Sequence, residues 1–534
     1  MIKRALPLLA LAALLASTNM TAHAQAKGDQ ALLDALVRKG VLTEKEAEEI
    51  SAETAKEAVT TSAAKIQIGD WVQELKLGGD LRIRNQWDQR TPMIKTNPLA
   101  GPVDNQLPRD RWRFRLRLTA DFKLQGNFFG GVMLSTSDNR AADTKNATIT
   151  GGYDNYGIFI ARAFMGWAPM PGLTFIAGKQ ANPFYTTDLI YDPDLDPGPG
   201  LVERIDFDKF FNMTFGEPVA AEGKEGKAPP PAPPPPGNSL ELALIAGQFV
   251  FQNNNANSGS TQLKWDAYQF QEQLLAKLKI GDKLSITEAP GFLSFNDSSS
   301  GGTPGAHGSI VPPVSTVGLT FDQTTGGAGD TLANSQPFPV TQRDLNIILA
   351  PGDITYKICG KPLSLYWDFA YNFSGDDRFN RDYGPLFSHF HFVGRTNNVV
   401  FSVPASPSFS DNASWLVGLK FGENKKAGDF SLSADYRQVG ISSIDPNLNS
   451  SNFALSNLNV QGWEFNLAYN LTDFLTAVFT FYYSHALHPN LYGGFATGNV
   501  INPATGTPFP SNQQFPVARD RQDLVLQCNL LMKF

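Results

Sequence analysis

Hydrophobic and polar residues alternate strictly along residues 109–123. One face carries Trp112, Phe114, Leu116, Leu118, Ala120 and Phe122, and the other is dominated by arginines. A period of two indicates a β-strand. Same-face neighbours lie roughly 7 Å apart, so Arg111, Arg113, Arg115 and Arg117 form a column of about 20 Å. Such a column needs water or acidic partners, and the apolar face needs a core or lipid. The strand therefore fits the wall of a water-filled membrane barrel, or the exposed face of a soluble sheet.

The same alternation continues along the chain and favours the barrel. It predicts strands at 75–87, 109–123, 128–136, 157–168, 173–180, 205–215, 240–251, 265–280, 283–295, 341–350, 363–373, 413–422, 429–439, 460–470, 473–484 and 521–534. We therefore predict an all-β fold, a transmembrane antiparallel β-barrel of about 16 strands. No fixed repeat supports a propeller or β-helix.

The connections alternate between short turns and long loops, as they do in membrane barrels. Long loops are expected near 88–108, 181–204, 296–340, 374–412, 440–459 and 485–520. The pattern predicts that these loops face the exterior and that both termini lie in the periplasm. A proline-rich insert, 216–239, interrupts a connection on the periplasmic side as a stiff polyproline II spacer.

The first 70 residues differ from the barrel, which we place at 71–534. Lys3 and Arg4, a short apolar run and Ala22-His-Ala24 predict a signal peptide at 1–24. Residues 25–70 are predicted to be a periplasmic helical segment and linker. It contains two short helices, the second starting at the capping box Thr43-Glu-Lys-Glu46. Cleavage removes two basic residues and takes the formal net charge from −7 to −9. An acidic secreted chain argues against nucleic acid as a partner. Two cysteines are too few for a disulfide framework.

Four segments resemble the putative porin family of Gram-negative outer membranes. They are residues 32–50, the Gly-Asp-Leu-Arg-Ile-Arg run at 79–84, the arginine-rich strand, and Lys179-Gln-Ala-Asn-Pro-Phe-Tyr within 179–194. The resemblance implies an outer-membrane channel. Phe534, which ends an alternating apolar face, resembles the recognition signal of the barrel-assembly machinery.

The resemblance also implies that the third long loop, 181–204, folds into the lumen and narrows it. We predict a constriction formed by its acids Asp188, Asp192, Asp194, Asp196 and Glu203. Facing them, we predict a pore-lining wall of Arg82, Arg84, Arg111, Arg113, Arg115, Arg117 and Arg162. Opposed charges of this kind set up a transverse field across the pore. Two alternatives remain for the loop: an exposed series of Asp-Pro turns, or a calcium site with an EF-hand-like spacing that lacks its glycine.

The predicted function is a porin for passive diffusion of small hydrophilic solutes or ions, with a weak to moderate anion preference. No cofactor, bound metal or catalytic residue is expected. The predicted partners are outer-membrane lipid, the barrel-assembly machinery and, by analogy, two further copies in a homotrimer. A structural tether or adhesin is the alternative, but it gives no reason for the arginine column. An enzyme is the other alternative, but Ser388-His389 and Ser484-His485 are adjacent on extended chain and point apart.

Overall fold

The computed structural model describes residues 71–90, 107–138, 144–211, 237–252, 267–296, 303–304, 310–311, 344–382, 407–446, 448–454, 458–488, 494–497, 514–517 and 522–534. The predicted signal peptide, the helical segment and all but the last three residues of the proline-rich insert lie outside these ranges. Residues Val72–Phe534 form one compact unit.

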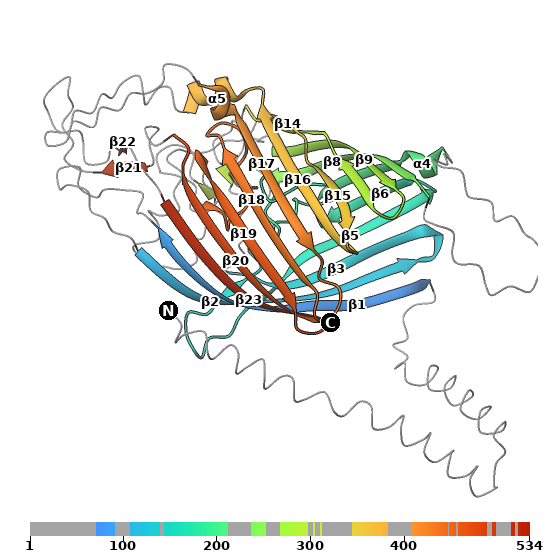
Figure 1. Ribbon diagram of the computed structural model, residues 1–534. Coiled ribbons are helices and arrows are strands. Elements are labelled where there is room, and N and C mark those ends of the chain that lie inside the picture. Colours follow the sequence, from blue (N-terminus) through green and yellow to red (C-terminus); the bar gives the residue numbers. More distant parts are fainter. Residues whose placement is uncertain are drawn as a thin grey trace, which may run out of the picture. The chain divides into compact units, whose positions relative to one another are not determined.

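The described part of this unit is dominated by one antiparallel sheet (Figure 1). Its strands are β1 (Val72–Arg90), β2 (Leu107–Leu124), β3 (Phe128–Thr136), β4 (Ala147–Thr148), β5 (Ile158–Met170), β6 (Leu173–Lys179), β7 (Gly200–Asp206), β8 (Ser239–Gln252), β9 (Ala267–Ile280), β10 (Leu284–Glu288), β11 (Gly291–Phe295), β14 (Asn346–Leu349), β15 (Gly352–Ile358), β16 (Lys361–Asn372), β17 (Ala413–Gly422), β18 (Phe430–Val439), β19 (Val460–Asn470), β20 (Leu475–Ala486) and β23 (Gln522–Lys533).

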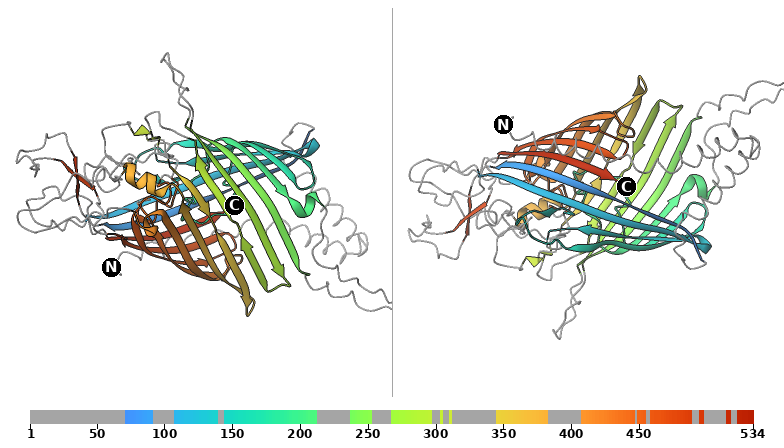
Figure 2. Two further views of the ribbon diagram at one scale, coloured as in Figure 1. Left: turned by 90° about the horizontal axis from the view of Figure 1, so that it is seen from above. Right: turned by 90° about the horizontal axis from the view of Figure 1, so that it is seen from below.

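The sheet closes on itself because β1 pairs with β2 on one side and with β23 on the other. Figure 2 shows these three strands side by side from above and below. In three places two consecutive strands, β3 and β4, β10 and β11, or β14 and β15, occupy one position in the wall. The described residues therefore make a closed barrel of 16 strand positions, which confirms the predicted all-β antiparallel barrel and its strand number.

Prolines explain two of the three interruptions. Pro290 separates β10 from β11, and Pro351 separates β14 from β15 at the same level of the wall. Proline has no N–H to donate to the ladder, so pairing lapses there. The proline carbonyls still accept hydrogen bonds from the neighbouring strands. Leu274 N donates to Pro290 O, and Ala289 N donates to Pro351 O, both at 2.9 Å.

Two predicted strands were wrongly placed. The strand expected at 205–215 is β7, Gly200–Asp206, because pairing resumes directly after the loop, where Val250 N donates to Pro199 O at 2.9 Å. The strand expected at 341–350 continues past Pro351 to Ile358. It then turns tightly at Cys359 and Gly360, whose φ angles of 50° and 78° suit a two-residue hairpin.

Polarity in the barrel wall is the reverse of that in a soluble protein. Apolar side chains on alternate positions point outward and are exposed; examples are Leu118, Val132, Met165, Leu419 and Leu467. The intervening positions point inward and carry buried polar or charged residues. This is the arrangement expected of strands that contact lipid outside and a polar interior inside.

The C-terminal residue completes the closing seam. Gly79 N donates to Phe534 O at 2.9 Å, and Phe534 N donates to Gly79 O at 3.1 Å. A Cβ atom at position 79 would lie 2.9 Å from two ring carbons of Phe534 and 2.3 Å from the Arg117 carbonyl oxygen. The seam therefore requires glycine there, since any side chain would displace the neighbouring strand or the aromatic ring.

Helices are short. Those in the described residues are η2 (Gln125–Asn127), α4 (Phe207–Phe210), α5 (Gly375–Asp382) and α7 (Phe409–Asn412). Two small hairpins, β12 (Thr303–Pro304) with β13 (Ile310–Val311) and β21 (Gly494–Thr497) with β22 (Gln514–Val517), are separate from the main sheet. Within the described ranges, no helix has the length and apolar character required to cross a bilayer.

Candidate functional site

Residues 181–199 cross the barrel interior. Near the start, Thr187 Oγ1 donates to Asp368 of β16 at 2.7 Å, and Arg437 of β18 contacts Asp188 at 2.8 Å. Near the end, Asp194 and Asp196 contact arginines of β1, β2 and β5. The strand order places these two groups of strands on opposite walls, so the segment bridges the lumen.

A second in-folded segment supports this bridge. Residues of the 440–459 connection, which we expected among the exterior loops, are largely buried. Ile444, Leu448 and Phe453 join Leu189 and Ile190 in one apolar cluster. Backbone bonds also link the segments: Asp192 N donates to Leu448 O at 2.7 Å, and Ser450 N donates to Asp188 O at 3.0 Å. The two connections therefore fold as a unit inside the barrel.

The predicted arginine column faces inward and is paired with acids. Arg111, Arg113 and Arg115 are each only 5–6% exposed. Six of the seven predicted arginines contact a carboxylate: Arg82 with Asp194 (3.0 Å), Arg111 with Asp88 (3.1 Å), Arg113 with Asp138 (3.2 Å), Arg115 with Asp80 and Asp194 (2.7 Å each), Arg117 with Asp80 (2.6 Å from Nε) and Arg162 with Asp196 (2.8 Å).

Arg84 differs from the other six. Its Nε donates to Asn529 Oδ1 at 2.6 Å, and a terminal nitrogen donates to Asn452 Oδ1 at 3.3 Å. Within the part of the chain that the structure describes, its partners are amides rather than carboxylates. We refer to the inward faces of β1–β6 as the basic wall.

The five predicted loop acids occupy four different positions. Asp194 and Asp196 lie against the basic wall, whereas Asp188 reaches the opposite wall. Asp192 accepts hydrogen bonds from Ser451 N at 2.7 Å and Ser451 Oγ at 2.6 Å. Glu203 does not belong to the loop: it lies in β7 on the exposed outer face, because that strand begins at Gly200. The loop acids therefore neutralise the arginines locally instead of opposing them across the pore.

Sequence reasoning missed the acids of the opposite wall. Arg437 of β18 is 1% exposed and contacts three carboxylates, Asp188 at 2.8 Å, Asp435 at 2.8 Å and Glu464 at 2.6 Å. We refer to the inward faces of β15–β19, with Asp353, Asp368, Asp435 and Glu464, as the acidic wall. A sequence signal existed: Glu464 lies between Trp463 and Phe465, and an acid flanked by outward aromatics on a strand must point inward.

Burial and charge act differently on two neighbouring loop acids. Burial raises the pKa of Asp192 to about 6, and the nearby charge of Asp194 adds to the effect. Burial also opposes ionisation of Asp194, but Arg82, Arg115 and Lys145 outweigh it and hold its pKa well below the usual range. The loop therefore remains anionic at the basic wall, whereas Asp192 takes up a proton in mildly acidic conditions.

The calcium alternative finds no site in the described residues. No group of three or more His, Cys, Asp or Glu side chains there is placed to hold a metal ion. Asp194 and Asp196 are bound by arginines and Lys145 instead. Of the two histidines considered for an enzyme, His389 lies outside the described residues, and His485 Nδ1 lies 3.1 Å from the carbonyl oxygen of Ala486.

The closed barrel has a charged interior and an internal bridge, and comparison with known proteins finds a family that matches part of the chain. Residues 48–300 match the family described as putative porin. The match confirms the resemblance predicted from the sequence. No curated protein matches the chain.

Solved porin structures align with the chain at low identity. They include a mutant of the Rh. blastica porin (8% identity, TM-score 0.35, 86% of this chain and 100% of that chain). Others are Pseudomonas putida OprB (10%, 0.40, 86% and 94%) and Salmonella typhi OmpF in complex with daunomycin (10%, 0.38, 86% and 97%).

Proposed function

We propose that this protein is an outer-membrane porin, a water-filled channel through which small hydrophilic solutes or ions diffuse passively. The observation that carries the proposal is the reversed polarity of a closed barrel. Apolar residues are exposed along the outer faces of the strands, while arginines and carboxylates line the interior. The family match over residues 48–300 supports the same function.

Planar-bilayer recording tests the proposal directly. Purified full-length protein, folded as judged by heat-modifiable mobility on a gel, should insert and produce stepwise conductance increases in potassium chloride. Heat-denatured protein from the same preparation serves as the control. Folded protein that inserts into bilayers without conducting would contradict the porin assignment and favour a structural tether.

We further propose that residues 181–199 and the basic wall form the constriction of the pore. The support is the set of ion pairs through which Asp194 and Asp196 hold the loop to β1, β2 and β5. Replacing both acids by asparagine removes these ion pairs without changing side-chain volume. Frequent flickering between conductance levels is expected in the variant. The matched variant Asp110→Asn, at an exposed position of β2, should remain as quiet as wild type.

The membrane context follows from the same geometry. The exposed apolar faces of the strands suit outer-membrane lipid, and in this proposal the short turns, the start of β1 and Phe534 lie at the periplasmic end. Association into a homotrimer is part of this proposal, and native mass spectrometry in detergent would test it.

Phe534 has a role in assembly in this proposal, because it completes the hydrogen bonds of the closing seam. An open seam leaves unpaired backbone groups in lipid. Deleting Phe534 should reduce the amount of heat-modifiable barrel in the membrane. Deletion without any loss of folded barrel would contradict its role as an assembly signal.

A further inference from the structure

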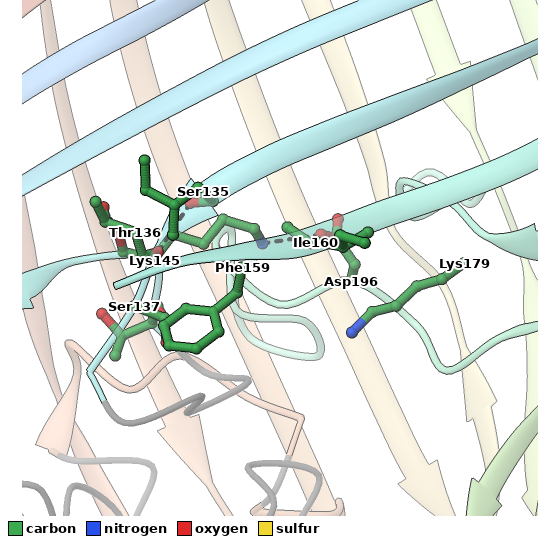
Figure 3. A pocket seen from close by; sticks show the side chains of 11 residues that line it. Ser135, Thr136, Ser137, Lys145, Phe159, Ile160, Lys179 and Asp196 are labelled. Atoms are coloured by element: carbon green, nitrogen blue, oxygen red, sulfur yellow. Dashed lines mark hydrogen bonds and ion pairs between the residues drawn. The ribbon is translucent and has the colours of Figure 1, made fainter. Parts of the chain in front are cut away.

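A cavity of about 420 Å³ lies beside the end of the in-folded loop. It is lined by β3, β5 and β6, by residues 144–145, and by Asp196 of the loop. Figure 3 shows Lys145 reaching Asp196, with the Phe159 ring and the Lys179 ammonium on different sides of the cavity. A cavity of this size accommodates a small organic molecule.

Positive charge exceeds negative charge around this cavity. The Asp196 carboxylate forms an ion pair with Lys145 Nζ at 2.9 Å. It also contacts two nitrogens of the Arg162 guanidinium, at 2.8 and 2.9 Å. Asp194, the next acid along the loop, is held by Arg82 and Arg115. One carboxylate therefore serves both Lys145 and Arg162.

Lys179 adds a third cation. It lines the cavity at the end of β6, where Gly178, with φ of 111°, interrupts the regular alternation of the strand. No hydrogen bond or ion pair joins its ammonium to any residue that the structure describes. An ammonium in a half-buried cavity gains most from an anionic ligand that replaces its lost water.

The remaining lining indicates what else the ligand carries. The hydroxyls of Ser135, Thr136 and Ser137 donate to carbonyl oxygens at 2.8–3.0 Å, so their protons are already used. Lys179 is thus the cationic lining residue that has no such partner among the described residues, and the Phe159 ring offers an apolar surface. These features suit one anionic group attached to a small, weakly polar body.

We propose that this cavity is a binding subsite for small organic carboxylates, held by Lys179 through the carboxylate and by Phe159 through the hydrocarbon body. The inference rests on the proposed channel, in which the subsite would lie beside the constriction. A carboxylate bound there would slow the passage of other ions, since it occupies part of the lumen.

Benzoate is a suitable probe because it combines a carboxylate with an aromatic ring. In single-channel recordings in potassium chloride, added benzoate should reduce the current in a saturable manner. Lys179→Gln should weaken this block about tenfold to a hundredfold, the loss expected for a hydrogen bond to a charged group. Lys179→Arg should retain most of it. Lys279→Gln, at an exposed position of β9 outside the cavity, removes the same charge and should block like wild type.

Two further ligands separate the chemical sources of binding. Benzamide, which has the same ring without the charge, should not block. Inorganic phosphate should block more weakly than benzoate, because it has no apolar body for Phe159. Equal block by phosphate and benzoate would overturn the organic-carboxylate assignment, and equal block of wild type and Lys179→Gln would overturn the subsite itself.

Equilibrium binding keeps this inference separable from the channel proposal. Saturation-transfer NMR of benzoate with folded, detergent-purified barrel should show binding that Lys179→Gln weakens. A barrel that conducts but binds no benzoate contradicts only the subsite. A barrel that binds benzoate through Lys179 but does not conduct contradicts only the channel.

Discussion

The basic and acidic walls of the barrel differ in how their charges are arranged. On the basic wall, most arginines come from one uninterrupted run of β2, and carboxylates of β1 and the loop fill the gaps between them. On the acidic wall, a single guanidinium, that of Arg437, lies among carboxylates from β18, β19 and the loop. The 181–199 segment is bound to both walls through acids that it contributes itself.

This difference affects how much each wall depends on any one residue. The basic wall is redundant, because Asp80 contacts both Arg115 and Arg117, and Asp194 contacts both Arg82 and Arg115. Among the described residues, the acidic wall lacks this redundancy, since the carboxylates of Asp188, Asp435 and Glu464 all pair with the buried guanidinium of Arg437. Removing one partner of a buried ion pair costs more than removing one charge from a network that can compensate.

The largest effect is therefore expected from Arg437→Gln. The variant leaves Asp188, Asp435 and Glu464 close together without their counter-charge, at a cost of roughly 3–5 kcal/mol. The temperature at which the barrel loses its heat-modifiable mobility should fall markedly. Arg204→Gln is the matched control, because Arg204 pairs with Asp206 and Glu241 in a more exposed setting and should cost about 1 kcal/mol or less. Equal losses in both variants would show that the acidic wall has no special dependence on Arg437.

A second effect concerns pH and the contact between the two in-folded segments. The pKa of Asp192 is raised to about 6 from 3.8, so between these values the folded protein retains a proton that the unfolded chain releases. This contribution to stability is complete below about pH 4 and is lost as pH rises through 6. A shift of two pKa units corresponds to about 3 kcal/mol as an upper limit. The neighbouring groups are Ser451, which donates to Asp192, and Asp194, whose charge is compensated by Arg82 and Arg115.

Asp192→Asn mimics the protonated form and isolates this contribution. Its thermal stability should match that of wild type at about pH 3.5 and exceed it at pH 7. If wild type is instead the more stable protein at pH 7, the carboxylate is stabilising in the fold and the sign of the argument is reversed.

Much of the barrel could be predicted from sequence because its determinants are local. In each strand, the alternation of apolar and polar residues shows which side chains face the barrel interior. Counting these strands gives the 16 positions of the wall. The errors came where alternation was weak or interrupted. Pro351 hid the continuity of β14 with β15. Because β7 starts earlier than expected, Glu203 lies on a strand and not in the predicted loop.

The site was only partly predictable, because its pairings join distant segments. The inward direction of the arginine column could be derived from β2 alone, but its partner Asp138 lies in a later connection, which alternation does not orient. The docking of the 440–459 connection depends on Leu448 and Phe453 meeting Leu189 and Ile190, more than 240 residues away. Whether a long polar loop folds inward is decided by such contacts, which sequence periodicity does not report.

The third effect tests whether the basic wall borders the path of the ions. Replacing Arg113 and Arg115 by glutamine should shift the reversal potential in a salt gradient towards cations. One charge about 4 Å from an ion contributes about 1 kcal/mol in water, or roughly a fivefold change in local ion concentration. Folding should be preserved, because each acid retains another partner. Asp80 still pairs with Arg117, Asp194 still pairs with Arg82, and Asp138 still accepts a hydrogen bond from Thr148 Oγ1 at 2.7 Å. An unchanged reversal potential with normal conductance would separate the arginines from the conduction path.

The smallest effect is the mirror image of the third, on the acidic wall. Glu464→Gln removes one negative charge while Arg437 keeps Asp188 and Asp435 at 2.8 Å, so the barrel should remain folded. The reversal potential should move towards anions, opposite to the shift for Arg113 and Arg115. The change should also be smaller, because one charge is removed rather than two and the remaining carboxylates still outnumber Arg437. If both variants shift the potential in the same direction, the walls do not act as opposing charges across one pore. If only the basic-wall variant responds, ions pass along the arginines and the acidic wall serves to anchor the loop.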